Sequence, residues 1–90
     1  MIVERFTGEG AKAVYQRVRR EGRMLPEGLR YVDSWVQADL GGCFQLMESD
    51  EVGPLQEWIA GWSDLAEFEV IPVASSRDTA DLMGRMDAEG

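Results

Sequence analysis

Carboxylic acids set among aromatic residues are the strongest chemical signal in this sequence. Asp33 lies two residues from both Tyr31 and Trp35, while Glu4 and Glu48 lie in two further runs of strand-forming residues. Side chains alternate along a strand, so residues two apart share a face, and these acids can gather in one aromatic-walled pocket. Burial and mutual repulsion would raise the pKa of at least one carboxyl, which is the condition for general acid or base catalysis near neutrality.

The catalytic candidates are therefore Glu4, Asp33, Glu48 and Tyr31. The residues expected to bind a ligand are aromatic, aliphatic and polar side chains facing the same pocket: Tyr31, Trp35, Phe44, Leu46, Glu48 and Arg5. Arg5 or a tyrosine would orient a polar group of the substrate. A second interpretation stays open, in which Asp33 and Glu48 lie in water and Glu4 pairs with an arginine, because structural ion pairs also perturb carboxylates.

Missing residue types exclude several kinds of site. One cysteine and no histidine rule out Ser–His and Cys–His catalysis and disfavour zinc, iron–sulfur clusters and haem held by histidine. No loop of closely spaced acids favours Mg²⁺ or Ca²⁺, so we expect neither a metal nor a cofactor. Cys43 is expected to face the helices as a small apolar side chain.

The charge is distributed unevenly along the chain. A net charge of −8 argues against binding to nucleic acid, whose phosphates would be repelled. Five of the nine cations fall within residues 12–23: Lys12, Arg17, Arg19, Arg20 and Arg23. Only Glu21 opposes them there, for a local charge of 5 − 1 = +4. This pattern is typical of a solvated helix face, and an anionic ligand or acidic partner is the alternative.

Neither a membrane segment nor a secretory signal is expected. No apolar run approaches the roughly 20 residues that a membrane helix needs. The first residues, MIVERF, lack the basic and apolar regions of a signal peptide. We therefore expect a cytoplasmic protein without a membrane partner.

Two segments have the apolar spacing of helices with one buried face. The first set is Ala11, Val14, Tyr15 and Val18. The second set is Leu55, Trp58, Ile59 and Trp62. Gly22 stands where the first helix should end, and Pro54 stands near the first turn of the second. The tail opens with the spacing of a capping box, Ser75 to Asp78, and we expect either a short docked helix or a frayed end there.

Strand-forming runs alternate with these helices. They cover residues 1–6, about 29–39, about 42–48 and 67–73. Pro72 lacks an N–H group and places the last strand on an edge. The order strand, helix, strand, strand, helix, strand predicts an α+β, ferredoxin-like βαββαβ domain over residues 1–74, followed by a tail over residues 75–90. Both helices of that fold cover one face of a four-stranded antiparallel sheet.

The central hairpin predicts that the other sheet face needs a cover. Alternation from the Gly41-Gly42 turn assigns smaller side chains to the helix side: Val32, Ser34, Val36, Ala38, Cys43, Gln45 and Met47. It assigns larger ones to the open side: Tyr31, Asp33, Trp35, Gln37, Phe44, Leu46 and Glu48. This aromatic surface matches the largest apolar patches usual on monomers, so we expect a homodimer. The alternative is that the tail of the same chain covers Trp35.

Three segments resemble a known family: IVERF, GRMLPEGLRYVDSWVQADLGGCFQLMES and LQEWIAGWSDLAEFEVIPV. They are similar to the short bacterial proteins of domain-of-unknown-function family 3303, over about residues 2–74. The resemblance implies the dimeric α+β barrel superfamily, in which two ferredoxin-like sheets face each other across a homodimer and enclose a cavity. It implies no activity, because the family is itself uncharacterised. Antibiotic-biosynthesis monooxygenases, muconolactone isomerases and haem-binding dismutases have this fold, but the likeness to them is one of fold and not of site.

The leading hypothesis for function is a homodimer that binds a small organic molecule in a cavity between the two sheets. The alternative is a cofactor-independent monooxygenase or isomerase that uses a buried carboxylate. A further alternative is an interaction dimer without a ligand.

Overall fold

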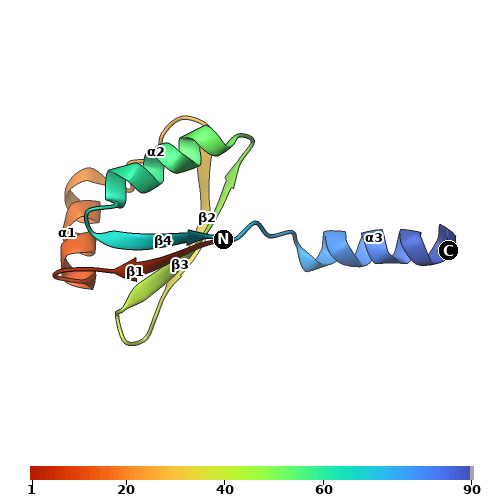
Figure 1. Cartoon of the computed structure of the whole chain (residues 1–90), viewed down its shortest axis with the longest axis horizontal. Coiled ribbons are helices and arrows are strands. Elements are labelled where there is room, and N and C mark those ends of the chain that lie inside the picture. The colour runs from red at the N-terminus through yellow and green to blue at the C-terminus, as the bar shows by residue number, and fades with distance from the viewer. Residues whose placement is uncertain (90) are drawn as a thin grey trace.

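The computed structural model describes residues 1–89 and has the expected order of elements (Figure 1). The strands are β1 (Ile2–Phe6), β2 (Leu29–Val36), β3 (Gly42–Ser49) and β4 (Ala66–Val70). The helices are α1 (Ala11–Glu21), α2 (Val52–Trp62) and α3 (Ser76–Glu89). The described chain is an α+β protein in which α3 stands apart from the body.

Within residues 1–89 the strands form one four-stranded sheet in the order β2-β3-β1-β4, and every neighbouring pair is antiparallel. This is the ferredoxin-like order, with β1 and β3 central and β2 and β4 at the edges. Side chains from α1 and α2 pack against the same core, so both helices cover one face. Among the described helices, none has the length and apolar character needed to cross a bilayer.

Glycine and proline mark the helix ends as predicted. Gly22 has a φ of 72°, and its N–H donates to the carbonyl of Val18 at 2.8 Å. A residue with positive φ is favourably glycine, and a glycine in this conformation commonly ends a helix, as Gly22 ends α1. Pro54 lies in the first turn of α2, where its missing N–H breaks no helical hydrogen bond.

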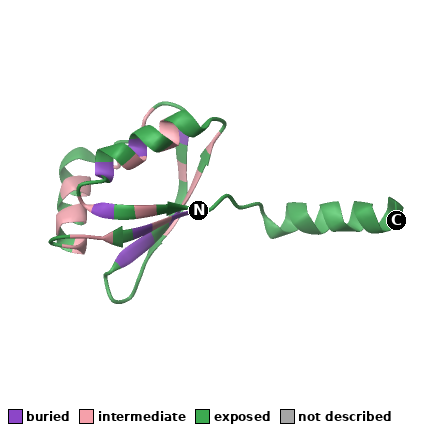
Figure 2. Cartoon of the chain, in the orientation of Figure 1, coloured by how far each residue is buried: buried purple, intermediate pink, exposed green. Residues whose placement is uncertain are grey.

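The core lies between the sheet and the inward face of α2. Its buried apolar residues are Ile2, Leu29, Trp58 and Trp62. The ring of Trp58 meets that of Phe68 edge-on, with centroids 5.6 Å apart, an arrangement that aromatic pairs favour. Figure 2 shows buried positions on the strands and on α2, whereas α1 is at most partly buried and α3 is exposed throughout.

A β-bulge in β2 reverses the expected face of Tyr31. Tyr31 pairs with Met47, but Asp33 pairs with the adjacent Leu46, so β2 has one extra residue, Val32, between them. Because Met47 packs against the core, Tyr31 points to the helix side. The prediction that Tyr31 lies on the open face is therefore wrong, since strict alternation fails across a bulge.

Alternation holds for the rest of the hairpin. The helix-side residues predicted correctly include Ser34, Cys43, Gln45 and Met47. The open-side residues predicted correctly are Asp33, Trp35, Phe44, Leu46 and Glu48. Gln37 and Ala38 belong to the turn, because β2 ends at Val36.

The hairpin turn is longer than the predicted Gly41-Gly42 pair. The N–H of Gln37 donates to the carbonyl of Gly42 at 2.9 Å, and Leu40 has a φ of 63°. Gly42 already belongs to β3, where a Cβ atom would collide with the backbone carbonyl oxygen of Glu4. Glycine is therefore required by the close approach of β1 and β3 rather than by the turn.

The tail forms a longer helix than predicted, and it projects from the end of the body where β4 ends (Figure 1). Ser75 provides the predicted cap, because its Oγ accepts a hydrogen bond from the N–H of Asp78 at 3.0 Å. β4 stops at Val70, so Pro72 lies in the connection to α3 rather than in the edge strand. Because α3 projects in this way, the long axis of the molecule is 53 Å.

Candidate functional site

Glu4 is a buried carboxylic acid on the central strand β1. It pairs with Cys43 on β3 and with Phe68 on β4, and the residue is only 6% exposed. Ile2, two residues earlier on the same strand, belongs to the core beneath α2. Glu4 therefore faces the helices, and the prediction that it joins the acids of the open face is wrong.

Burial raises the pKa of Glu4 above its ordinary value of 4.5. Polar contacts from the side chains of Gln45 and Cys43, and the positive charge of Arg23, act in the opposite direction but are weaker. Glu4 thus holds its proton more firmly than an exposed glutamate does. This property suits a group that donates and accepts protons nearer neutrality.

The Arg23 side chain contacts both Gln45, which neighbours Glu4, and Tyr31. Its Nη1 donates to the Oε1 of Gln45 at 3.2 Å, so the amide NH₂ of Gln45 remains available to the Glu4 carboxyl. Its guanidinium carbon lies 3.7 Å from the centroid of the Tyr31 ring, a cation–π contact. The Tyr31 and Ser34 hydroxyls are 2.6 Å apart and share a hydrogen bond.

The backbone carbonyl of Arg23 accepts hydrogen bonds from two indole N–H groups. Trp58 donates at 2.9 Å and Trp62 at 3.1 Å. The two tryptophans are four residues apart, one turn of α2, so their rings lie on the same face of the helix. The chain after α1 is thereby tied to α2, which holds the Arg23 side chain beside Gln45.

A small cavity lies between the sheet and the helices, beside the Glu4 carboxyl. Its lining residues are Glu4, Val14, Val18, Arg23, Gln45, Trp58 and Trp62. Its volume of about 30 Å³ has room for one or two water molecules. α1 contributes Val14 and Val18, which are only partly buried, to its lining. The buried acid therefore has a space beside it whose outer wall is the least buried helix of the body.

Cys43 lies next to Glu4 but is a poor nucleophile. Burial, followed by the negative charge of Glu4, raises the pKa of its thiol from 9.0 to about 11. Its Sγ lies 3.8 Å from the carbonyl oxygen of Phe44. A thiol that stays protonated at neutral pH does not attack substrates. The structure confirms that Cys43 is a small buried side chain on the helix side.

Other predicted site residues lie on the opposite side of the sheet. Trp35 pairs with Phe44, which pairs in turn with Val3 on β1. We call the apolar surface formed by Val3, Trp35, Phe44 and Leu46 the open-face patch. Trp35 is 51% exposed and Phe44 is 36% exposed. The patch is apolar and uncovered, which is the character of an interface.

The charged residues around the open-face patch form exposed ion pairs instead of a pocket. Arg5 meets Glu67 at 3.5 Å, and Glu48 meets Arg30 at 3.1 Å. Asp33 accepts a hydrogen bond from the backbone of the next residue at 2.8 Å. The predicted site is thus divided, with Glu4 and Tyr31 on the helix side. The open side holds Arg5, Asp33, Trp35, Phe44, Leu46 and Glu48.

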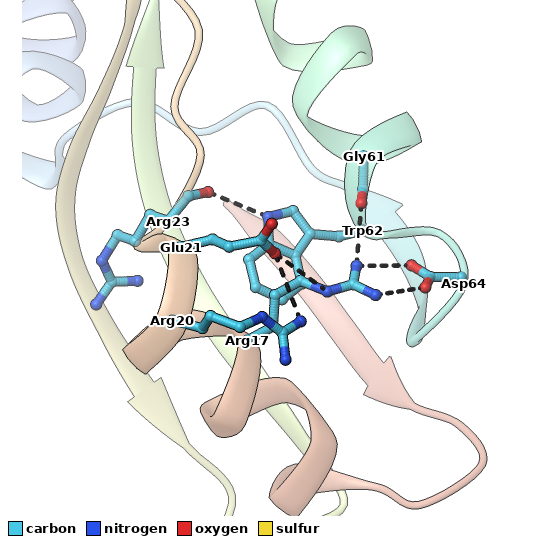
Figure 3. A network of polar contacts seen from close by, with 7 residues as sticks. All are labelled: Arg17, Arg20, Glu21, Arg23, Gly61, Trp62 and Asp64. Carbon is cyan, nitrogen blue, oxygen red and sulfur yellow. Dashed lines mark hydrogen bonds and ion pairs between the residues drawn. The ribbon is translucent and has the colours of Figure 1, made fainter.

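Arg17, one of the five cations within residues 12–23, stabilises the fold. Its guanidinium makes two hydrogen bonds to the Asp64 carboxylate, at 2.9 and 2.6 Å, and a third to the carbonyl of Gly61 at 3.3 Å (Figure 3). It also lies 5.3 Å from the centroid of the Trp62 ring. The hydrogen bond from Arg17 holds the pKa of Asp64 below its usual value of 3.8. Arg17 therefore links α1 to the end of α2 and to the turn that follows it.

The remaining cations of the segment fit the predicted solvated face. Lys12, Arg19 and Arg20 are exposed on α1. Arg20 approaches Glu21 at 3.7 Å (Figure 3). Across residues 1–89, acidic and cysteine side chains do not gather in threes as a metal site requires.

A larger groove opens where β4 leads into the connection to α3. We call it the end groove, and its volume is about 500 Å³. Its apolar walls include Ile2, Leu29, Met47, Val52, Leu55 and Val70. The connection itself, through Ile71 to Val73, forms one side. The groove therefore borders the core, whose residues Ile2 and Leu29 are themselves buried.

Sequence reasoning missed Arg23, Gln45 and the two indoles as neighbours of Glu4. Gln45 was the only amide in the set assigned to the helix side, and a buried amide needs hydrogen-bond partners. Trp58 and Trp62 each bring an N–H group that needs an acceptor when buried. The need of the Gln45 amide and the two indole N–H groups for hydrogen-bond partners could have predicted a polar cluster on this face.

One family model matches almost the whole chain. The model of a family described as Domain of unknown function (DUF3303) matches residues 1–87. The chain belongs to this family. Comparison of this DUF3303 protein with curated proteins and with solved structures gives no match.

Proposed function

We propose that this DUF3303 protein is a cytoplasmic homodimer that binds a small organic molecule against the carboxyl group of Glu4. The observation that carries the proposal is the buried carboxyl with a cavity beside it. Glu4, Arg23 and Gln45 supply polar groups, and the rings of Trp58 and Trp62 supply apolar walls. A few convergent polar groups in an apolar setting are typical of small-molecule sites.

The cavity has to enlarge before it holds an organic ligand. Its volume of about 30 Å³ is well below the roughly 300 to 1,000 Å³ of ordinary ligand pockets. α1 is the wall that yields, because none of its residues 11–21, all of which the structure describes, is fully buried. The hydrogen bonds between Arg17 and Asp64 resist that movement. Ligand binding is therefore coupled to an outward shift of α1.

A proton-transfer enzyme is the second candidate, and the raised pKa of Glu4 favours it. A carboxylate of raised pKa is a stronger base, and its acid form returns the proton afterwards. Isomerases and cofactor-independent monooxygenases both begin by removing a proton from the substrate. Glu4 would be the base, and the Arg23 guanidinium would stabilise the developing anion.

The homodimer is supported by the open-face patch. Trp35 and Phe44 pair across β2 and β3 without a cover from the described chain, and Val3 extends the patch onto β1. An apolar surface rimmed by charged residues is typical of a protein interface. A second copy presents the same patch, so the contact is self-complementary about a two-fold axis.

Ligand-detected binding to Glu4 tests the proposal. We suggest titrating the protein with a panel of small phenols, lactones and unsaturated ketones while recording the indole N–H resonances of Trp58 and Trp62. A true ligand shifts both signals, because both indoles line the cavity. Glu4→Gln should weaken binding by at least tenfold, while Glu48→Gln, on the open face, should leave it unchanged. A panel that moves neither resonance, or equal effects of the two variants, would refute the site.

A further inference from the structure

We propose that α3 is an exchange arm, which docks its apolar stripe in the end groove of a second copy and receives that copy's arm in return. This inference rests on the homodimer of the proposed function. It identifies a pair of surfaces, the stripe and the groove, that the open-face patch does not include.

α3 carries an apolar stripe that nothing in its own body covers. Leu82, Met83 and Met86 lie on one side of the helix, at i, i+1 and i+4, and are 44%, 56% and 55% exposed. An isolated helix of 14 residues is marginal in water, and Gly84 weakens this one further. The helix therefore needs an apolar surface to pack on.

The root of the arm, residues 71–75, directs α3 away from the rest of its own chain. Ile71 is held by two hydrogen bonds with Met1, each 2.8 Å. The helix is capped at Ser75, so only residues 72–74 lie between the two fixed points, and Pro72 restricts them further. Figure 1 shows the resulting arm extended from the end of the sheet. The stripe is thus presented to another molecule.

The end groove has the size and chemistry to receive such a stripe. Its volume is about 500 Å³, and core residues such as Leu29 and Met47 form its walls. Val52 and Val70, which also line it, are 64% and 45% exposed. A groove of this kind is filled by an amphipathic helix in a common mode of recognition. Methionines suit the contact, because their flexible side chains adapt to irregular surfaces.

A second copy is the occupant that fits best, because arm and groove lie side by side in each chain. Ile71, Pro72 and Val73 are both the root of the arm and one side of the groove. A two-fold axis near this root brings each arm to the other groove, and the contact is made twice. With 14 residues, α3 is about 21 Å long.

The two aromatic rings of the open-face patch supply only part of the area that a stable dimer buries. Its half-exposed Trp35 and one-third-exposed Phe44 leave on the order of 200 Å² of ring surface uncovered. A stable interface buries about 800 Å² on each partner. Exchanged arms add the stripe and the groove on both copies, and so bring the interface toward that size.

The charge of α3 disfavours a membrane or a nucleic acid as its partner. Two arginines and four acids give the helix a charge of 2 − 4 = −2. Helices that lie on membranes usually carry lysine and arginine on their polar face. The apolar stripe, rather than the net charge, is what fits the end groove, because the groove is itself lined by Glu48, Asp50 and Glu51 against one cationic side chain, Arg30.

Disulfide trapping between single variants tests the exchange on the full chain. We suggest mixing Met83→Cys, on the stripe, with Val52→Cys, in the groove lining, under mild oxidation. Exchange predicts a cross-linked species of about 20 kDa, twice the 10.1 kDa chain, from the mixture. Met83→Cys mixed with Lys12→Cys, which lies outside the groove, is the matched control and should not cross-link. The native Cys43 stays silent because it is buried and its pKa is about 11.

The doubly substituted chain, with Met83→Cys and Val52→Cys together, separates exchange from an arm folded back on its own body. Exchange predicts a covalent dimer, whereas a fold-back gives an internal disulfide at 10.1 kDa and overturns the proposal. Absence of any cross-link also overturns it. These outcomes are independent of ligand binding at Glu4, so failure of the exchange is distinguishable from failure of the ligand site.

Charge substitutions on the two sides of α3 give an independent measurement. Leu82→Lys with Met86→Lys should raise the dimer dissociation constant at least tenfold. Ala88→Lys, placed on the polar side, should change it less than twofold. Equal effects, or an unchanged constant in the stripe variant, overturn the exchange but leave a dimer through the open-face patch intact. A wild-type protein of 10.1 kDa at micromolar concentration overturns both.

Discussion

The two faces of the sheet treat polar groups differently. On the covered face, Glu4 and Gln45 are buried, and within the described residues every buried side-chain nitrogen or oxygen has a hydrogen-bond partner. On the open face, charged residues such as Arg5 and Glu67 form exposed pairs around an apolar patch. Buried polar groups are costly unless paired, whereas exposed pairs contribute little. Our proposals rest on this contrast, with a ligand site on the covered face and a dimer contact on the open one.

Removing one tryptophan from each face gives the largest expected difference. Trp58→Ala should lower the free energy of unfolding by about 3 to 5 kcal/mol, because it opens a cavity in the core. Trp35→Ala should lower it by less than about 1 kcal/mol in the monomer, since half of its surface is already exposed. Urea denaturation at low protein concentration measures both. Equal losses would show that the open face is covered within a single chain.

Gly42→Ala tests the close contact that aligns β1 with β3. The new Cβ atom would meet the backbone carbonyl oxygen of Glu4, and we expect a loss of about 1 to 3 kcal/mol. Gly84→Ala is the control, because nothing lies within 4 Å of a Cβ atom there. It should not destabilise the protein and should increase the helicity of α3. Thermal unfolding followed by circular dichroism compares the two, and a neutral Gly42→Ala would contradict the register.

Asp64→Asn should destabilise the protein in a pH-dependent way. The pKa of Asp64 is lowered by Arg17, so its contribution to stability is present above its ordinary value of 3.8 and is lost as the pH falls through the folded value. The melting temperature of the variant should therefore be lower at pH 7 and converge with wild type in acid. Glu67→Gln, which removes an exposed pair on the open face, is the control and should have little effect at either pH.

Glu4→Gln should show the opposite dependence on pH. The folded protein holds the Glu4 proton more firmly than the unfolded chain, so wild-type stability falls as the pH rises from the ordinary value of 4.5 through the folded pKa. Glutamine has no such proton to lose, and the variant should gain stability relative to wild type over that range. Denaturation curves at several pH values measure this difference. A constant difference would show that Glu4 is not shifted.

The sequence predicted the fold because its apolar spacing was regular. The sets that include Val14 and Trp58 placed α1 and α2, and Gly22 marked the end of the first helix. The site was predicted less well, because its residues depend on strand pairing. The bulge at Val32 has no distinctive sequence and moved Tyr31 to the other face.

The face of Glu4 was ambiguous for a different reason. Both faces of β1 combine apolar and charged residues, with Ile2 and Glu4 on one and Val3 and Arg5 on the other. Only the pairing of Glu4 with Cys43 decides between them. Alternation within a strand gives the two sets but not which set is covered.

The direct test of the central claim is the titration of Glu4 by ¹³C NMR of its carboxyl carbon. The account predicts a midpoint above 4.5, because burial disfavours the charged form. It also predicts that the shifts of the Trp58 and Trp62 indole N–H signals follow the same midpoint, since both rings line the same cavity. A midpoint at or below 4.5, with indole signals that do not respond, would contradict the assignment of the chemistry to the covered face.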